Sequence, residues 1–181
     1  LANARPAAGS TEQKARQMMV YNALKAAGFN DFLSKVFTGI IGRENDYSDA
    51  MYHVHVDAEN RKINLGLISW QGDRGIRLRS FLKQRGLMVD DLNMKKSVEA
   101  INAQAVFMYW ELTDPKSTEK RKDIMALTGG SIPNAVEFIE TVFVRPHEDN
   151  TRGYARQKVF NYIKMLEQQL GQNTSTTQAM L

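Results

Sequence analysis

The stretch "VFTGIIGREND" at residues 36–46 decides how the rest of the chain is interpreted. It opens with apolar residues typical of a helix and closes with a polar run. Residues three, four and seven positions apart share a helix face, so Glu44 falls on the same face as Phe37, Ile40 and Ile41. A carboxyl among apolar groups loses hydration, which raises its pKa and suits a general acid. The alternative is a helix-terminal Glu that turns toward water.

Helical periodicity continues on both sides of this stretch. A first helix is expected to begin after Ser10, where Gln13 completes a capping box, and to end near Gly28. A second is expected to begin at Asn30. The second carries the apolar stripe Phe32, Leu33, Val36, Phe37, Ile40 and Ile41, and later helices are expected near 74–85, 94–112, 117–127, 132–143 and 150–170.

The segment 51–69, "MYHVHVDAENRKINLGLIS", has a different pattern. Alternation and the polar "AENRK" turn predict a β-hairpin. The alternation places His53, His55 and Asp57 on one face. Two imidazoles and a carboxylate can bind Zn²⁺, but the chain has one further His and no H-E-x-x-H helix. A second interpretation is a cleft facing Glu44, with Asp57 as the partner carboxylate, and a third is an exposed polar face on a short hairpin.

The next segment, "NLGLISWQGDRGIRLRSFL" at 64–82, places Trp70 among polar residues at the hairpin exit. Sugar rings stack on aromatic faces, and their hydroxyls need hydrogen-bond partners such as Ser69, Gln71 and Arg74. This composition fits the wall of a sugar-binding groove. It fits a Trp70 in the core equally well.

Composition indicates one globular domain of 181 residues, 43% of them hydrophobic. The absence of Cys excludes a disulfide framework and a thiolate metal site. No apolar run approaches the roughly 20 residues of a membrane-spanning helix, so no membrane insertion is expected. The net charge of +4 favours a polyanionic partner. The basic residues are scattered, however, which indicates a solvated basic surface rather than a nucleic-acid site.

The two ends of the chain differ from its centre. Residues 1–10, "LANARPAAGS", contain no signal peptide and are interpreted as a linker, which suggests a domain of a longer protein. Residues 171–181 are polar and low in complexity, and they are expected to be disordered. The catalytic domain is therefore expected to span 11–170.

Four sequence blocks carry a family resemblance. They are "GIIGRE" at 39–44, "GLISWQGDR" at 66–74, "FMYWELT" at 107–113 and "FVRPHEDNTRGYA" at 143–155. In this order they resemble the phage tail lysozyme family of the lysozyme-like superfamily, with its "GILGN…E", "GLAQWTGDR", "WWELN" and "FERP…R…YA". Similar domains also occur at the ends of secreted antibacterial effectors.

The chain departs from the family pattern at three positions. Asn45 stands where the family often has Ser, and Ser69 where it usually has Gln; both changes concern the cleft. Val144 stands where the family has Glu. That departure is interpreted as structural, with Arg145 pairing or capping and Pro146 ending a helix.

The resemblance implies a mainly α, lysozyme-like α+β fold in which one β-hairpin flanks the cleft. It implies that Glu44 protonates the glycosidic oxygen between N-acetylmuramic acid and N-acetylglucosamine. Asp57, thirteen residues later as in the goose-type lysozymes, would hold water or stabilise oxocarbenium charge, with Asp49 and Asp46 as alternatives. The substrate-groove candidates are Tyr52, His55, Ser69, Trp70, Gln71 and Arg74.

The predicted function is therefore a peptidoglycan muramidase that needs no cofactor or metal. It would act in the periplasm or cell wall of a target bacterium after delivery by a tail or secretion apparatus, and a cognate immunity or inhibitor protein would be a further partner. The alternatives are a lytic transglycosylase and a non-catalytic structural or binding module of a tail or secretion spike. Chitosanase is disfavoured because a basic cleft repels cationic chitosan, and nucleic-acid binding rests on net charge alone.

Overall fold

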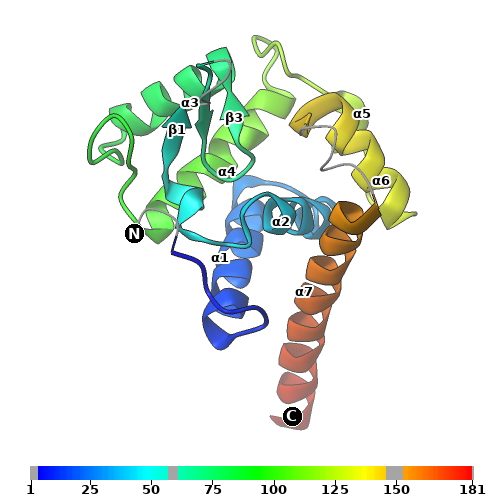
Figure 1. Ribbon diagram of the computed structural model, residues 1–181. Helices are drawn as coiled ribbons and strands as arrows, with labels where there is room; N and C mark the ends of the chain where they lie inside the picture. Colours follow the sequence, from blue (N-terminus) through cyan, green and yellow to red (C-terminus); the bar gives the residue numbers. More distant parts are fainter. Residues whose placement is uncertain (1–3, 57–60, 146–152, 181) are drawn as a thin grey trace.

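A computed structural model describes residues 4–56, 61–145 and 153–180, and it is mainly helical with one small sheet (Figure 1). The elements, in chain order, are α1 (Thr11–Ala27), α2 (Asp31–Asn45), the 3₁₀ turn η1 (Asp49–Tyr52), β1 (Val54–Val56), β2 (Ile63–Leu65), β3 (Trp70–Gln71), α3 (Gly72–Gln84), α4 (Val98–Thr113), α5 (Lys122–Met125), α6 (Ile132–Ile139), the π-helical turn η2 (Glu140–Val144) and α7 (Gly153–Met180).

The ends of α1 and α2 follow the capping signals of the sequence. Ser10 Oγ accepts a hydrogen bond from the Gln13 backbone N–H, and Gly28 ends α1 with a φ of 121°. The Asn30 side chain accepts from the Leu33 N–H and starts α2. The predicted boundaries of α1 and α2 are confirmed. Each capping residue determines the helix end through hydrogen bonds within one helical turn.

Helix α2 is the central helix of the core, and α7 packs along it (Figure 1). Its predicted stripe is fully buried from Leu33 to Ile41, with Phe32 partly buried. Two glycines permit the close approach of α7. A Cβ at Gly39 would lie 2.5 Å from Ile163 Cγ1, and one at Gly42 would lie 2.6 Å from Tyr162 Cδ2. This packing fixes the end of α2, where Glu44 lies.

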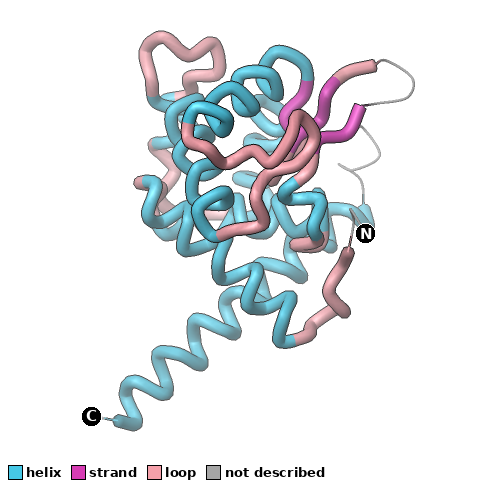
Figure 2. The backbone as a smooth tube through the Cα atoms, turned by 90° about the vertical axis from the view of Figure 1, so that its left-hand side faces the viewer, coloured by secondary structure: helices cyan, strands magenta, loops and turns pink. Residues whose placement is uncertain are grey.

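The predicted hairpin forms and gains a third strand. The antiparallel sheet has the order β1-β2-β3, with Val54 opposite Leu65 and Leu65 opposite Trp70. The first residues of the predicted hairpin instead form the 3₁₀ turn η1. Figure 2 shows the strands together at one side of the molecule, far from the end of α7.

Several helix boundaries differ from the sequence prediction. Helix α4 begins at Val98, because Ser97 caps it, and the helix expected at 117–127 shrinks to α5. The segment predicted to be disordered after residue 170 continues α7 to Met180. Extending an existing helix fixes one residue per hydrogen bond, which is far less costly than nucleating a new one.

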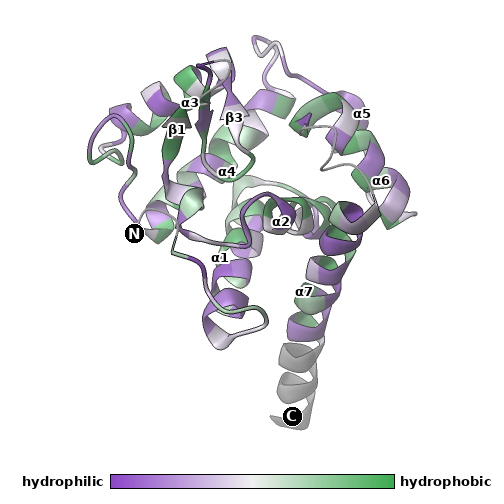
Figure 3. Cartoon of the chain, in the orientation of Figure 1, coloured by the Kyte–Doolittle hydropathy of each residue, from purple (hydrophilic) through white to green (hydrophobic). Residues whose placement is uncertain are grey.

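Hydrophobic and hydrophilic residues alternate along the outer helices α1 and α6 and along the coloured part of α7 (Figure 3). Each of these helices therefore has one buried face, as expected for helices packed around a core. Within the described part of the chain, no helix is both long and apolar enough to cross a membrane.

Val144 and Arg145 fit the structural interpretation of their block. Val144 is buried, and Arg145 ends η2 with a φ of 50°. The Arg145 N–H donates to Glu140 O at 2.7 Å, and its Nη2 lies 2.8 Å from Glu119 Oε2. Arg145 therefore both caps and pairs, as predicted. Pro146 lies outside the described residues.

Candidate active site

Glu44 lies in the last turn of α2 and lines a pocket of about 440 Å³. The other lining residues come from the N-terminal segment, the end of α2, the loop before η1, η1 and the residue after it, the strands β1 and β2, and the turn between β2 and β3. The described lining residues are Arg5, Glu44, Asn45, Ser48, Ala50, His53, Val54, Leu65, Gly66 and Ser69. A pocket therefore lies at the predicted junction between the helix and the hairpin.

The Glu44 carboxyl is removed from water, with a side-chain exposure of 9%. Burial raises its pKa above the ordinary value, and this effect outweighs the lowering by the charge and hydrogen bond of Arg43. The negative charge of Glu140 raises the pKa further, while a hydrogen bond from Ser69 lowers it. Glu44 therefore keeps its proton to a higher pH than a solvated glutamate.

Arg43 connects Glu44 to a second buried carboxylate. Its Nη2 lies 2.7 Å from Glu44 Oε1, while its Nη1 pairs with Glu140, whose side chain is fully buried. Arg156 also approaches Glu140, with Nε 3.4 Å from Oε2. Because Glu140 shares the Arg43 charge, Arg43 does not fully offset the burial of Glu44.

The turn after β2 brings Ser69 to Glu44. Gly66 adopts a φ of 73° at the start of this turn, and a Cβ there would lie 2.2 Å from Gln104 Oε1. Ser69 itself has a φ of 52°. Asn45 Nδ2 donates to Leu67 O at 3.1 Å and ties the turn to the end of α2. Asn45 and Ser69, the two cleft positions that depart from the family pattern, thus both line this pocket.

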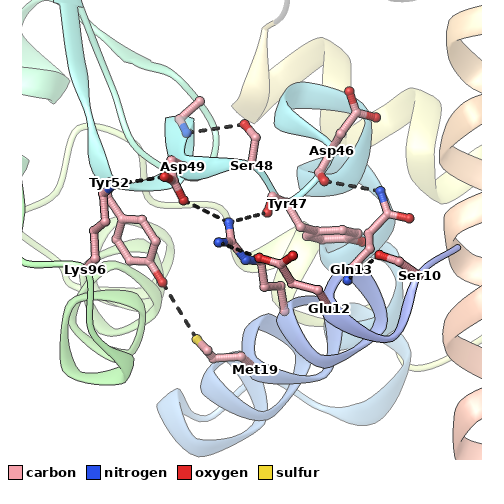
Figure 4. Close-up of polar contacts among 12 residues, drawn as sticks. Ser10, Glu12, Gln13, Met19, Asp46, Tyr47, Ser48, Asp49, Tyr52 and Lys96 are labelled. Carbon is pink, nitrogen blue, oxygen red and sulfur yellow. Dashed lines mark hydrogen bonds and ion pairs between the residues drawn. The ribbon is translucent and has the colours of Figure 1, made fainter. Parts of the chain in front are cut away.

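The loop that follows Glu44 is held against α1 by polar contacts (Figure 4). Arg16 Nη1 donates to Tyr47 O and to Asp49 Oδ1, both at 3.0 Å. Gln13 Nε2 donates to Asp46 O at 3.3 Å. Figure 4 also shows Lys96 reaching Asp49, with Nζ 2.8 Å from Oδ2. These contacts fix one side of the pocket relative to α1.

Neither alternative for the second carboxylate lines the pocket. Burial acts to raise the pKa of Asp49, but hydrogen bonds and charge from Lys96 and Arg16 outweigh it and lower that pKa. Asp46 pairs with Lys158 at 2.7 Å, with Arg5 at 3.1 Å and with the Tyr162 hydroxyl at 2.6 Å. Both carboxylates are thus committed to structural contacts.

The interpretation of Trp70 as a groove wall is wrong. Trp70 is 1% exposed, because the alternation of β3 turns it into the core, and its Nε1 donates to Glu111 Oε1 at 2.6 Å. A side chain without exposed surface has no face on which a sugar could stack.

Arg74 and Tyr52 are also structural residues. The Arg74 guanidinium donates to both Glu111 oxygens, at 2.9 and 3.0 Å, and to Phe143 O at 2.8 Å. Tyr52 is 5% exposed and directs its hydroxyl toward Met19 Sδ. Gln71 is exposed but does not line the pocket. Of the described groove candidates, only Ser69 lies at the site.

These contacts join three of the four sequence blocks at Arg74. Its own block, 66–74, meets the block 107–113 through Glu111 and the block 143–155 through Phe143. The Arg74 guanidinium also lies 4.8 Å from the centre of the Phe143 ring. Arg74 and Glu111 therefore form a buried framework and do not line the pocket.

Two hairpin residues cannot be placed as side chains. Asp57 lies outside the described residues, and His55 is described only by its backbone, in β1 opposite Asn64. His53 lines the pocket, and its Nδ1 lies 2.8 Å from Asn93 Oδ1. The described residues contain no group of three metal-binding side chains, and the zinc interpretation depends on Asp57.

Sequence reasoning missed Arg5 as a pocket residue. It lies in the segment interpreted as a linker, yet Pro6 is buried and Ala4 O accepts from the Asp49 N–H at 2.9 Å. No local pattern marks such a contact, since the two residues are far apart in the chain.

A comparison with protein-family models, curated proteins and solved structures finds no match. The family resemblance of the four blocks stays a prediction.

Proposed function

We propose that the chain is a muramidase that hydrolyses the β-1,4 bond between N-acetylmuramic acid and N-acetylglucosamine in peptidoglycan, with Glu44 as the general acid. The observation that carries the proposal is a buried carboxyl of raised pKa in the wall of a pocket. Such groups cluster at sites of acid–base chemistry. The lysozyme-like fold and the phage tail lysozyme resemblance belong to the same proposal.

In this mechanism the protonated Glu44 gives its proton to the glycosidic oxygen as the bond to the anomeric carbon breaks. Positive charge then develops on the sugar ring, and water completes the hydrolysis. The resulting Glu44 carboxylate forms 2.7 Å from Arg43 Nη2 and accepts a hydrogen bond from Ser69. Burial thus favours the proton before the reaction, while Arg43 and Ser69 stabilise the anion after it.

The second carboxylate of the proposal is Asp57, which would hold the water or stabilise the ring charge. Asp46 and Asp49 are less suitable, because each is ion-paired and neither lines the pocket. Among the described lining residues Glu44 is the only acid. This observation favours a lytic transglycosylase as the second candidate, because that reaction uses one Glu and no water and leaves an anhydro product.

Digestion of purified peptidoglycan followed by mass spectrometry tests the proposal and separates the two reactions. A muramidase releases fragments with reducing N-acetylmuramic acid ends. A lytic transglycosylase releases anhydro ends that are lighter by one water. Fragments of neither kind, from a protein shown to be folded, would instead indicate a non-catalytic structural or binding module.

The biological setting is part of the proposal as well. The enzyme would act in the cell wall or periplasm of a target bacterium after delivery by a tail or secretion apparatus. A cognate immunity or inhibitor protein would bind at the Glu44 pocket.

A further inference from the structure

The N-terminal segment 4–10 forms part of the pocket. Ala4 is held by its backbone, through the hydrogen bond from Asp49 N, and Pro6 is buried. Arg5 lies between these two anchors and lines the pocket together with Glu44. The position of Arg5 is therefore set by its neighbours, and its side chain does not have to hold the segment in place.

The Arg5 guanidinium remains available to a ligand. Its side chain is 65% exposed, and its Nη1 forms an ion pair with Asp46 Oδ2 at 3.1 Å. The other oxygen of Asp46 already pairs with Lys158 at 2.7 Å and accepts a hydrogen bond from Tyr162. Two cations thus share one carboxylate, so Asp46 does not neutralise both charges. Arg5 is the only arginine or lysine among the described lining residues.

A planar guanidinium binds a carboxylate through two parallel hydrogen bonds, a geometry that an ammonium lacks. We propose that Arg5 is a substrate-binding residue that holds a carboxylate of the glycan strand. This inference rests on the proposed function and adds a selectivity to it. Arg5 would favour muramic-acid-containing strands over uncharged N-acetylglucosamine polymers.

The carboxylate has two chemical sources in peptidoglycan. In strands without peptides, the lactyl group of muramic acid ends in a free carboxylate. In peptide-bearing strands, that carboxyl is joined in an amide bond, and the free carboxylates belong to the stem peptide. Soluble fragments of the two kinds therefore distinguish the sources.

Calorimetric titration of the Glu44→Gln protein tests the inference, since this variant should not cleave the ligand during the measurement. The three ligands are peptide-free glycan fragments, peptide-bearing fragments and N-acetylglucosamine oligomers of equal length. Adding Arg5→Gln should weaken binding of one or both carboxylate-bearing ligands about fivefold, as for a partly exposed charge pair. It should leave binding of the neutral oligomers unchanged, and high salt should shrink the difference.

The matched control is Arg77→Gln, which removes the same charge from an exposed position of α3 outside the pocket lining. A loss confined to peptide-free fragments assigns the lactyl carboxylate, and a loss confined to peptide-bearing fragments assigns the stem peptide. If Arg5→Gln behaves like Arg77→Gln, or weakens the neutral oligomers equally, the assignment of Arg5 is overturned while the proposed function stands. If no ligand binds the folded Glu44→Gln protein, the proposed function fails and this inference fails with it.

Discussion

Replacing Gly39 by Ala should destabilise the protein, although alanine is the better helix former. The added Cβ would lie 2.5 Å from Ile163 Cγ1, 3.0 Å from Ile163 Cδ1 and 3.1 Å from the backbone oxygen of Val159. Ile163 is packed in the core, and the Val159 oxygen belongs to the backbone of α7. The clash can therefore be relieved only by moving α7 away from α2.

The magnitude follows from two opposing effects. Forcing an extra methyl group into a packed core costs about 1–3 kcal/mol. Replacing glycine by alanine inside a helix returns about 1 kcal/mol. We expect Gly39→Ala to lower the free energy of unfolding by up to about 2 kcal/mol. The cost should approach the upper value if α7 resists the shift, since the same helix also packs on Gly42.

Urea unfolding followed by far-UV circular dichroism measures this change. The matched control is Gly171→Ala in α7, where an added Cβ meets no atom within 4 Å. The control should gain up to about 1 kcal/mol from helix propensity alone. If Gly39→Ala stabilises the protein as much as Gly171→Ala does, α2 and α7 do not pack as closely as described.

Three further predictions concern the buried framework and the carboxylates. Glu111→Gln should lower the free energy of unfolding by about 3 kcal/mol, because it leaves the Arg74 guanidinium without a charged partner; an unchanged urea midpoint would contradict the framework. Glu44→Gln should stabilise the protein at a pH well above 4.5 and have less effect below it. Because the pKa of Glu44 is raised in the folded state, native stability falls as pH rises from the ordinary value of 4.5 through the folded-state value. An equal effect of the substitution at both pH values would argue against a raised pKa. Asp57→Asn should reduce peptidoglycan hydrolysis more than Asp46→Asn or Asp49→Asn, whose carboxylates are ion-paired and do not line the pocket. If Asp49→Asn reduces turnover most in a folded protein, the role assigned to Asp57 is wrong.

The parts of the fold that the sequence predicted depend on local signals. Ser10, Gly28 and Asn30 mark the ends of α1 and α2 within a single helical turn, and the hydrophobic spacing of α2 places Glu44 on its buried face. The hairpin could be predicted for the same reason, since the alternation of a strand is a local pattern.

The roles of Trp70 and Arg74 depend on contacts that no local pattern specifies. Both residues pair with Glu111, which is distant in sequence and lies in an apolar helix. A buried glutamate in α4 needs cationic or hydrogen-bond-donating partners, so Glu111 was the residue that indicated a buried polar contact. Arg5 offered no such signal, because a short polar segment packs only where the finished fold provides a surface.

The role of Glu44 as general acid is tested most directly by measuring the release of new reducing ends from purified peptidoglycan by the wild-type protein and by Glu44→Gln. We expect Glu44→Gln to remain folded and to lose activity by roughly a hundredfold to ten-thousandfold, because the amide cannot donate the acidic proton. Glu99→Gln, at an exposed position in the first turn of α4, should keep full activity. Near-normal activity of a folded Glu44→Gln protein would contradict the assignment of Glu44 as the general acid.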